Sequence, residues 1–197
     1  MKLLDARKDH YRKLAHEQGF RSRAAYKLKE LNQSYRLIGP GFYVLDLGCA
    51  PGGWTQMAVK LAGNHGKVMG IDLSYVEEIP GAHIIRENIE DEHVIDEIMS
   101  YFERKVNAVI CDLSPKVSGN WSVDHAKQIS LNYDCTKIMD KVLAHKGNAV
   151  FKVFDGEYSM EFKDYIKKKF ARINLTKPKA SRKQSSELYY VCLGFIG

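Results

Sequence analysis

The sequence predicts an α/β fold with one mostly parallel seven-stranded sheet, helices on both faces and an antiparallel last strand. Two observations predict it. Apolar runs of strand length alternate with helical patterns, and the final two runs have no full helix between them. A chain of 197 residues fits one domain with a sizeable core. No repeat, low-complexity tract or linker divides it, so we expect residues 1–197 to form a single domain.

The expected strands cover residues 42–47, 67–73, 82–85, 107–113, 148–154, 172–175 and 188–195. The helical patterns between them cover residues 54–62, 92–103, 124–144 and 159–170. One further helix, near residues 22–34, belongs to a basic N-terminal helical extension over residues 1–40. Ligands of such sheets bind outside the carboxyl ends of the strands, so the candidate site residues are sought there.

Composition excludes several classes of protein. No apolar run approaches the roughly 20 residues that span a bilayer, and the N-terminus lacks the pattern of a secretory signal. The four cysteines form no CxxC pair, and the seven histidines show no metal-ligand spacing. We therefore expect a cytoplasmic protein with reduced thiols, no metal and no membrane contact. Nothing in the sequence requires an oligomer, so we expect a monomer.

The net charge of +6 is distributed unevenly. Residues 1–40 carry ten Lys and Arg against four acidic residues, and residues 163–183 carry nine against one. The middle of the chain, residues 41–162, carries eleven against eighteen. Two basic ends around an acidic middle are typical of a protein that binds a polyanion, although a charge run can also be only a solvated face.

The strongest local signal is the run Asp46-Leu47-Gly48-Cys49-Ala50-Pro51-Gly52-Gly53-Trp54. A buried strand leads into a glycine-rich turn and then a helix, and glycines there let the backbone approach a ligand closely. The spacing departs from the dinucleotide pattern GxGxxG. Asp72 ends the next strand, where a carboxylate can accept hydrogen bonds from both hydroxyls of a ribose. Together these features favour a cofactor that contains adenosine.

Two polar residues stand at the ends of later strands. Lys152 lies inside the apolar run Val150–Phe154, and Asp112 follows the apolar run before residue 112. Strand lysines usually face solvent, and an aspartate before Ser-Pro is often only a turn residue. In an apolar setting, however, a lysine can act as a base, because burial or a nearby cation destabilises its ammonium form. Both side chains are expected to point into the same crevice.

The motif Asp46–Trp54, with the segment Asp112-Leu113-Ser114-Pro115-Lys116-Val117-Ser118-Gly119, resembles the FtsJ/RrmJ family of ribose methyltransferases. The resemblance runs from about Arg21 to the end of the chain. It implies a Rossmann-like class I methyltransferase fold and S-adenosyl-L-methionine as cofactor. The cofactor-binding positions it implies are Asp46, Gly48, Gly52, Trp54, Asp72, Asn88 and Asp112. Bacterial members usually carry Asp at position 88, where an amide can also bond an exocyclic amine.

The resemblance also implies a catalytic tetrad, whose members match Lys27, Asp112, Lys152 and Glu187 in this chain. Methyl transfer to a hydroxyl is an in-line displacement that requires alignment and removal of a proton. Lys152 would accept the 2′-hydroxyl proton or orient that hydroxyl. Lys27 would supply the nearby cation, and the two carboxylates would hold the ammonium groups.

Two basic clusters adjoin tetrad residues in the sequence. Arg21, Arg23 and Lys29 flank Lys27, and a second cluster precedes Glu187 at Lys177, Lys179, Arg182 and Lys183. Their phosphate contacts would supply affinity without reading sequence. We expect Arg21, Arg23, Lys179 and Arg182 to bind RNA. The resemblance suggests a uridine of large-subunit ribosomal RNA as the target, within naked rRNA or the large ribosomal subunit.

Other readings stay open at this point. Relatives of similar architecture modify tRNA or the mRNA cap, and the cofactor motif cannot separate these substrates. A non-catalytic RNA-binding protein could retain the fold, and an NAD-dependent oxidoreductase could use a similar sheet. Trp121, Tyr189 and Tyr190 are expected to be core or packing residues rather than base-stacking platforms.

Overall fold

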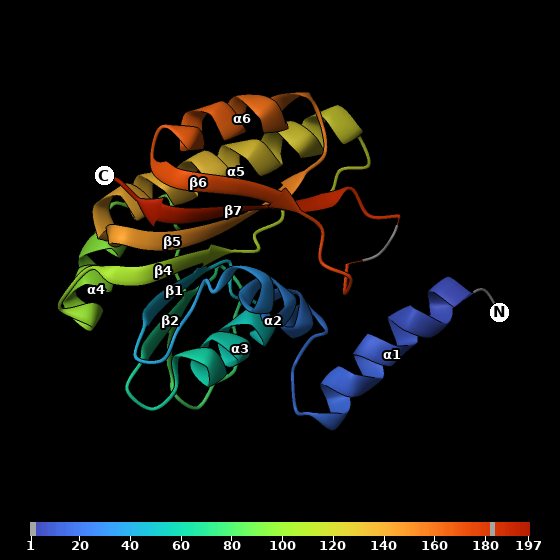
Figure 1. The fold of residues 1–197 in the computed structure, drawn as a ribbon, viewed down its shortest axis with the longest axis horizontal. Helices are drawn as coiled ribbons and strands as arrows, with labels where there is room; N and C mark the ends of the chain where they lie inside the picture. The colour runs from blue at the N-terminus through green and yellow to red at the C-terminus, as the bar shows by residue number, and fades with distance from the viewer. Residues whose placement is uncertain (1–2, 182–183) are drawn as a thin grey trace.

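The computed structural model describes residues 3–181 and 184–197 (Figure 1). Its strands are β1 Tyr43–Leu47, β2 Lys67–Ile71, β3 Ala82–Ile85, β4 Val106–Cys111, β5 Leu143–Phe154, β6 Phe170–Thr176 and β7 Glu187–Phe195. Its helices are α1 Leu3–Glu17, α2 Ala24–Tyr35, α3 Gly53–Ala62, α4 His93–Phe102, α5 Trp121–Val142 and α6 Glu157–Lys167.

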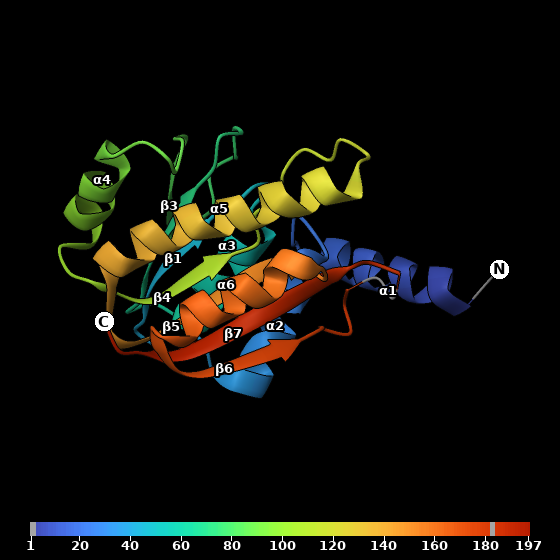
Figure 2. The ribbon, with the colours of Figure 1, turned by 90° about the horizontal axis from the view of Figure 1, so that it is seen from above.

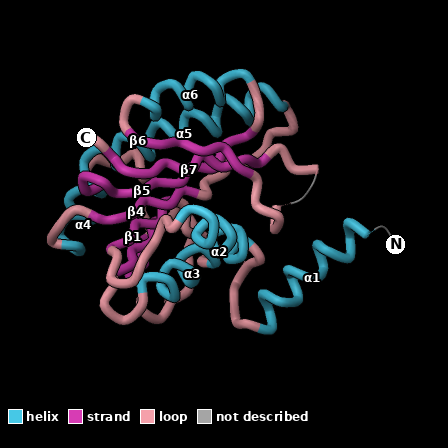
Figure 3. The backbone as a smooth tube through the Cα atoms, viewed as in Figure 1, coloured by secondary structure: helices cyan, strands magenta, loops and turns pink. Residues whose placement is uncertain are grey.

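The strands form one seven-stranded sheet in the order β3-β2-β1-β4-β5-β7-β6 (Figure 3). Strands β1 to β5 run parallel, and β7 is antiparallel to both of its neighbours. The predicted fold class is confirmed, including the antiparallel pair at the end. The chain moves outward from β1 in both directions, and the carboxyl ends of β1 and β4 therefore form the switch point at which such sheets bind ligands.

Helices cover both faces of the sheet (Figures 1 and 2). Helices α4, α5 and α6 pack on one face around Leu45, Phe151 and Tyr190. Helices α2 and α3 pack on the other around Val44 and Val150. Because successive side chains of a strand point to opposite faces, this pattern predicts that Asp46 and Lys152 face the α2–α3 layer.

The basic N-terminal extension contains two helices, where the sequence pattern predicted one near residues 22–34. Helix α2 matches that prediction, and α1 extends past the edge of the sheet (Figure 1). Their contact centres on Tyr26, whose hydroxyl donates to the Leu14 carbonyl at 3.1 Å and contacts Gln18 Oε1 at 2.9 Å. The Tyr11 hydroxyl donates to Glu30 Oε1 at 3.0 Å. The two helices thus pack through one buried and one partly buried tyrosine ring, each with a polar tip.

Several predicted boundaries shift: α6 ends at Lys167 rather than at residue 170, and β6 begins at Phe170 rather than at residue 172. Helix α5 begins at Trp121 rather than at residue 124, because the Asn120 side chain caps it by accepting from the Val123 N–H. Strand β5 begins at Leu143 rather than at residue 148.

The prediction that Tyr189 and Tyr190 are core residues is confirmed, since both are fully buried. Trp121 is not part of the core, since the residue is 49% exposed on the first turn of α5, but its ring packs on those of His125 and Phe154.

All four cysteines are free and buried, as predicted. In the described part of the chain, none of the helices combines the length and the apolar character that crossing a bilayer requires.

Candidate active site

Strand pairing places Lys152 opposite Tyr189. The two residues are register partners across the antiparallel β5–β7 pair, and Phe154 pairs with Glu187 two residues further along. Directly opposed residues project to the same face of a sheet. The Lys152 and Tyr189 side chains therefore both extend into the α2–α3 layer, beneath Lys27 of α2. Lys152 is 4% exposed and Lys27 is 6% exposed.

The Tyr189 hydroxyl connects the two ends of the predicted tetrad. Lys27 Nζ donates to Glu187 Oε2 at 3.0 Å and to the Tyr189 hydroxyl oxygen at 3.2 Å. The same hydroxyl donates to Asp112 Oδ1 at 2.9 Å. Sequence reasoning missed this role of Tyr189. Its alternation with Glu187 along one strand was the signal that could have found it, since residues two apart share a face.

Lys152 completes the cluster. Its Nζ donates to the Asp112 backbone carbonyl at 2.6 Å and lies 3.4 Å from Asp112 Oδ1. All four predicted catalytic residues are thus brought together from α2, the end of β4, β5 and β7. We call these four residues and Tyr189 the catalytic cluster. Two cations and two carboxylates nearly cancel, which allows the cluster to be buried without a large net charge.

The electrostatics of the cluster keep Glu187 ionised and the Tyr189 phenol protonated. Burial by itself would raise the pKa of Glu187, but Lys27, with a smaller contribution from Lys152, lowers it below the usual value. Burial raises the pKa of Tyr189 well above its usual range, and the charges of Asp112 and Glu187 add to this. Tyr189 therefore stays a hydrogen-bond donor to Asp112.

The glycine turn after β1, which we call the cofactor loop (residues 46–54), needs its glycines. Gly48 has a φ of +79°, and a Cβ there would lie 2.3 Å from the Leu113 side chain. Gly52 has a φ of +111°, and its Cβ would lie 2.6 Å from Ile79. No side chain can be accommodated without moving these neighbours. The loop therefore packs directly against the segment after Asp112, next to the catalytic cluster.

Asp46 is a buried carboxylate with an unpaired oxygen. It is fully buried, and its Oδ2 accepts from the Thr55 hydroxyl at 2.6 Å, whereas its Oδ1 has no partner among the described residues. Burial raises the pKa of Asp46 to about 7, the charges of Asp112 and Asp72 add to the rise, and the Thr55 bond opposes it. An unpaired buried carboxylate oxygen fits a cofactor that carries an ammonium group and a sulfonium.

The remaining predicted cofactor residues support the loop. Asp72 Oδ2 accepts from the Ala50 N–H at 3.0 Å, and its Oδ1 accepts from the Ser74 N–H at 2.8 Å. Trp54 is buried, and its indole N–H donates to the Ala24 carbonyl of α2 at 2.8 Å. Asn88 lies three residues past β3 and is partly buried. Asp72 thus holds the cofactor loop in place, and Trp54 joins it to the helix of Lys27.

The predicted RNA-binding residues occupy different surroundings. Arg21 lies against the cofactor loop, where Nη1 and Nη2 donate at 2.8 Å to the backbone carbonyls of Glu77 and Glu78 respectively. Arg23 lines a pocket of about 470 Å³ together with Lys27 and Glu187. The backbone N–H of Lys179 donates to Glu30 on α2. Arg182 lies outside the described residues. The RNA-binding assignments stay predictions. The Arg21 guanidinium already binds backbone carbonyls of the loop between β2 and β3.

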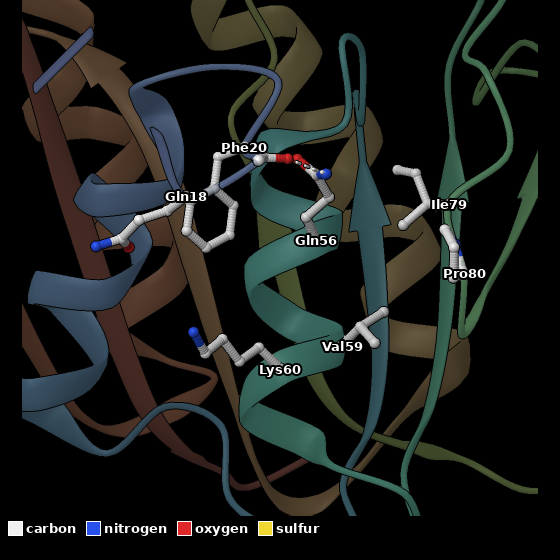
Figure 4. Close-up of a pocket in the computed structure, with 8 residues that line it drawn as sticks. Gln18, Phe20, Gln56, Val59, Lys60, Ile79 and Pro80 are labelled. Carbon is white, nitrogen blue, oxygen red and sulfur yellow. Dashed lines mark hydrogen bonds between the residues drawn. The ribbon is translucent and has the colours of Figure 1, made fainter. Parts of the chain in front are cut away.

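A second pocket, of about 240 Å³, lies over α3 and contains none of the predicted site residues (Figure 4). Gln56, Val59 and Lys60 of α3 stand between Phe20 on one side and Ile79 on the other (Figure 4).

Within residues 3–181 and 184–197, one group of side chains offers ligand atoms close enough together to hold a metal ion. Ligand atoms of Glu87, His93 and Glu97 lie within 4.8 Å of one another, and His93 Nε2 is 3.3 Å from Glu87. His93 and Glu97 are exposed. The sequence prediction of no metal therefore stays a prediction.

Comparison with known proteins adds a family match. The model of the FtsJ-like methyltransferase family matches residues 20–195. The chain is 93% identical over 197 residues to a ribosomal RNA large subunit methyltransferase E of Nitrosopumilus maritimus, and each chain is covered completely. It is 41% identical to the protein of that name from Methanocaldococcus jannaschii, with 99% of this chain and 82% of that one covered.

A solved structure has the same fold. A Plasmodium falciparum protein described as a ribosomal RNA methyltransferase superimposes with a TM-score of 0.82 at 30% identity. The match covers 90% of this chain and all of the other.

Proposed function

The chain belongs to the FtsJ-like methyltransferase family, and we propose that it methylates the ribose of a uridine in large-subunit ribosomal RNA, using the catalytic cluster described above. It is an S-adenosylmethionine-dependent enzyme, a 2′-O-ribose methyltransferase. Relatives covered over most of their length carry the name of a large-subunit rRNA methyltransferase, which supports this substrate. We further propose that the chain is a monomeric, single-domain protein of the cytoplasm.

The observation that carries the catalytic proposal is the chain of contacts from Glu187 through Lys27 and Tyr189 to Asp112 and Lys152. S-adenosylmethionine supplies a methyl group on a sulfonium. The leaving group is then a neutral thioether, which needs no acid to protonate it. Lys152 binds or accepts the proton of the ribose 2′-hydroxyl while that oxygen attacks the methyl carbon. With the cofactor bound, its carbon–sulfur bond would break as the oxygen–carbon bond forms.

The other residues position Lys152 and the cofactor. Asp112 holds the ammonium through its carboxylate and its backbone carbonyl. Lys27 places a second cation in the cluster and is held there by Glu187 and the Tyr189 hydroxyl. The Asp46 carboxylate and the cofactor loop would hold the cofactor, with Asp72 at the ribose and Asn88 at the adenine. The basic residues Arg23, Lys179 and Arg182 would bind phosphates.

The test is transfer of labelled methyl from S-adenosylmethionine to total RNA and to isolated large ribosomal subunits, mapped by sequencing that detects 2′-O-methylation. Incorporation at one large-subunit uridine, lost in Lys152→Ala, is the expected result. Incorporation only into tRNA or capped mRNA would refute the proposed substrate while keeping the chemistry. Cofactor binding without any transfer would refute the catalytic proposal.

A further inference from the structure

Three aromatic rings form a stack at the carboxyl edge of the sheet that no step of the proposed reaction uses. Trp121 is stacked on His125 with centroids 6.0 Å apart and planes 12° apart. His125 is stacked in turn on Tyr158 at 5.5 Å and 17°. Trp121 is 49% exposed and Tyr158 is 40% exposed, whereas His125 between them is 3% exposed. The two outer residues of the stack are thus partly exposed, and the central ring is buried.

The central ring is held from two sides. His125 belongs to α5, and its Nε2 accepts the backbone N–H of Tyr158 at 3.1 Å. A Cβ on Gly156 would lie 2.8 Å from the imidazole, so the turn before α6 closes directly onto the ring. A stacking surface that is already fixed loses little conformational entropy when a ligand binds.

The stack also contains an unsatisfied atom. His125 Nδ1 carries the proton of the neutral ring, because Nε2 is an acceptor. This nitrogen is buried and has no hydrogen-bond partner in the part of the chain that the structure describes. Buried polar atoms without partners are uncommon in folded proteins.

The stack is joined to the catalytic cluster. The Trp121 ring lies 5.8 Å from the ring of Phe154, two residues beyond Lys152 on β5. Gln128, one turn after His125, donates to the Lys152 carbonyl at 3.0 Å and to the Leu113 carbonyl at 3.1 Å. The start of α5 and the loop between β6 and β7 lie at the same edge of the molecule (Figures 1 and 2).

Hydrogen bonds to Asp124 also hold the loop from Asp112 to α5 in place. Asp124 accepts from the backbone N–H and hydroxyl of Ser118 at 2.7 and 2.8 Å and from the Gly119 N–H at 3.2 Å. The position of Trp121 relative to the end of β4 is therefore set by hydrogen bonds and not only by packing.

We propose that the Trp121 ring is a stacking platform for a base of the RNA substrate next to the ribose that is methylated. This inference rests on the proposed function of the catalytic cluster. The nearly parallel rings suit a flat ligand, and stacking on indole tolerates any base. The charges of Asp155 and Glu157 act on His125, so the surroundings disfavour a phosphate and favour an uncharged ring. The phosphates would instead lie towards the basic residues near Lys27.

The experiment uses tryptophan fluorescence and methyl transfer together. The chain has two tryptophans, and Trp54 is buried, so quenching by added polyuridylic acid reports on Trp121. We expect quenching in the wild type and its loss in Trp121→Phe. Inorganic polyphosphate, which has no bases, should not quench; equal quenching by polyphosphate would overturn the proposal.

On large-subunit rRNA, Trp121→Ala should raise the KM for RNA by about 5- to 100-fold, with S-adenosylmethionine affinity and Tm unchanged. Trp121→Phe, which keeps a ring, should retain most of the affinity. Ile196→Ala, at a similarly exposed apolar residue just after β7, should change nothing.

The outcomes separate this inference from the proposed function. An unchanged KM in Trp121→Ala, with a wild type that methylates RNA, overturns the platform alone. A wild type that methylates no RNA refutes the proposed function, whereas polyuridylic acid quenching still decides whether Trp121 stacks on bases. A defect of Trp121→Ala on intact subunits but not on naked rRNA would assign the stack to a protein partner and overturn base stacking.

Discussion

The cofactor loop and the catalytic cluster are neighbours at the carboxyl edge of the sheet, yet they are constructed differently. The loop is nine consecutive residues, Asp46–Trp54, whose shape depends on glycines with positive φ. The cluster takes its side chains from four segments that are up to 162 residues apart, as for Lys27 and Tyr189. The loop depends on backbone conformation, and the cluster depends on the register of β5 with β7 and on the docking of α2.

Because of this difference, substitutions in the cofactor loop and in the catalytic cluster should have different effects. A change in the loop should affect folding and cofactor affinity together, because its backbone packs against Leu113. A change in the cluster should affect catalysis while the fold remains, because its charges nearly cancel and its strands are held by the ladder.

The largest effect is expected at Lys152. Lys152→Ala should lower kcat by about 10²- to 10⁴-fold, the range that a positioned acid–base group contributes. Cofactor affinity should stay near the wild-type value, because Lys152 lies outside the cofactor loop. Single-turnover methyl transfer and calorimetric titration with S-adenosylmethionine measure the two quantities. Near-normal turnover at every pH would remove Lys152 from the mechanism.

Gly48→Ala should show the opposite pattern. The positive φ and a Cβ at 2.3 Å from Leu113 should together cost about 2–4 kcal/mol of folding stability, with loss of cofactor binding. Gly41→Ala is the matched control, since Gly41 has a φ of +77° but nothing within 4 Å. It should cost about 1 kcal/mol from the backbone alone. Equal losses in denaturant unfolding of the two variants would mean that the close approach to Leu113 is unimportant.

A smaller effect is expected when the connecting hydroxyl is removed. Tyr189→Phe leaves Lys27 and Asp112 each without one hydrogen bond, so kcat should fall by about 5- to 20-fold, or about 1–2 kcal/mol. Tyr190→Phe is the control, because its hydroxyl bonds the Ser159 carbonyl on the opposite face. If both variants lose the same activity, the effect comes from packing and not from the cluster.

The smallest effect concerns the pH dependence of stability at Asp46. Its pKa rises from an ordinary value near 3.8 in the unfolded chain to about 7 in the fold. The folded state therefore favours the protonated form, and the stabilisation present below pH 3.8 is lost as the pH rises through 7. Between pH 6 and pH 8 this should remove about 1.4 kcal/mol.

Asp46→Asn should abolish that part of the pH dependence, as measured by urea unfolding at the two pH values without cofactor. Asp140→Asn, at a carboxylate paired with Lys169 and far from the loop, is the control. Parallel pH profiles for wild type and Asp46→Asn would show that the buried carboxyl does not titrate in this range.

The predicted fold and family resemblance are confirmed, and most strand positions were readable because apolar runs and glycine turns are local signals. The start of α5 is not readable from a local pattern, because the cap at Asn120 depends on how the loop after Asp112 folds back onto Asp124. The sequence predicts that Trp121 is a core or packing residue. Its place on the rim follows from the direction in which α5 leaves the sheet, which no local pattern contains.

The sequence by itself determined the alternation of strands and helices, the glycines of the cofactor loop and, through resemblance, the identity of the four tetrad residues. Only the tertiary structure decided that Tyr189 joins the two lysine–carboxylate pairs, that Arg21 clamps the loop before β3, and that Trp121 stacks on a buried histidine. The physical reason is the distance along the chain over which each kind of interaction acts. Backbone conformation and hydrophobic period act within a few residues, whereas these contacts join segments separated by whole strands and helices and exist only once the sheet has assembled.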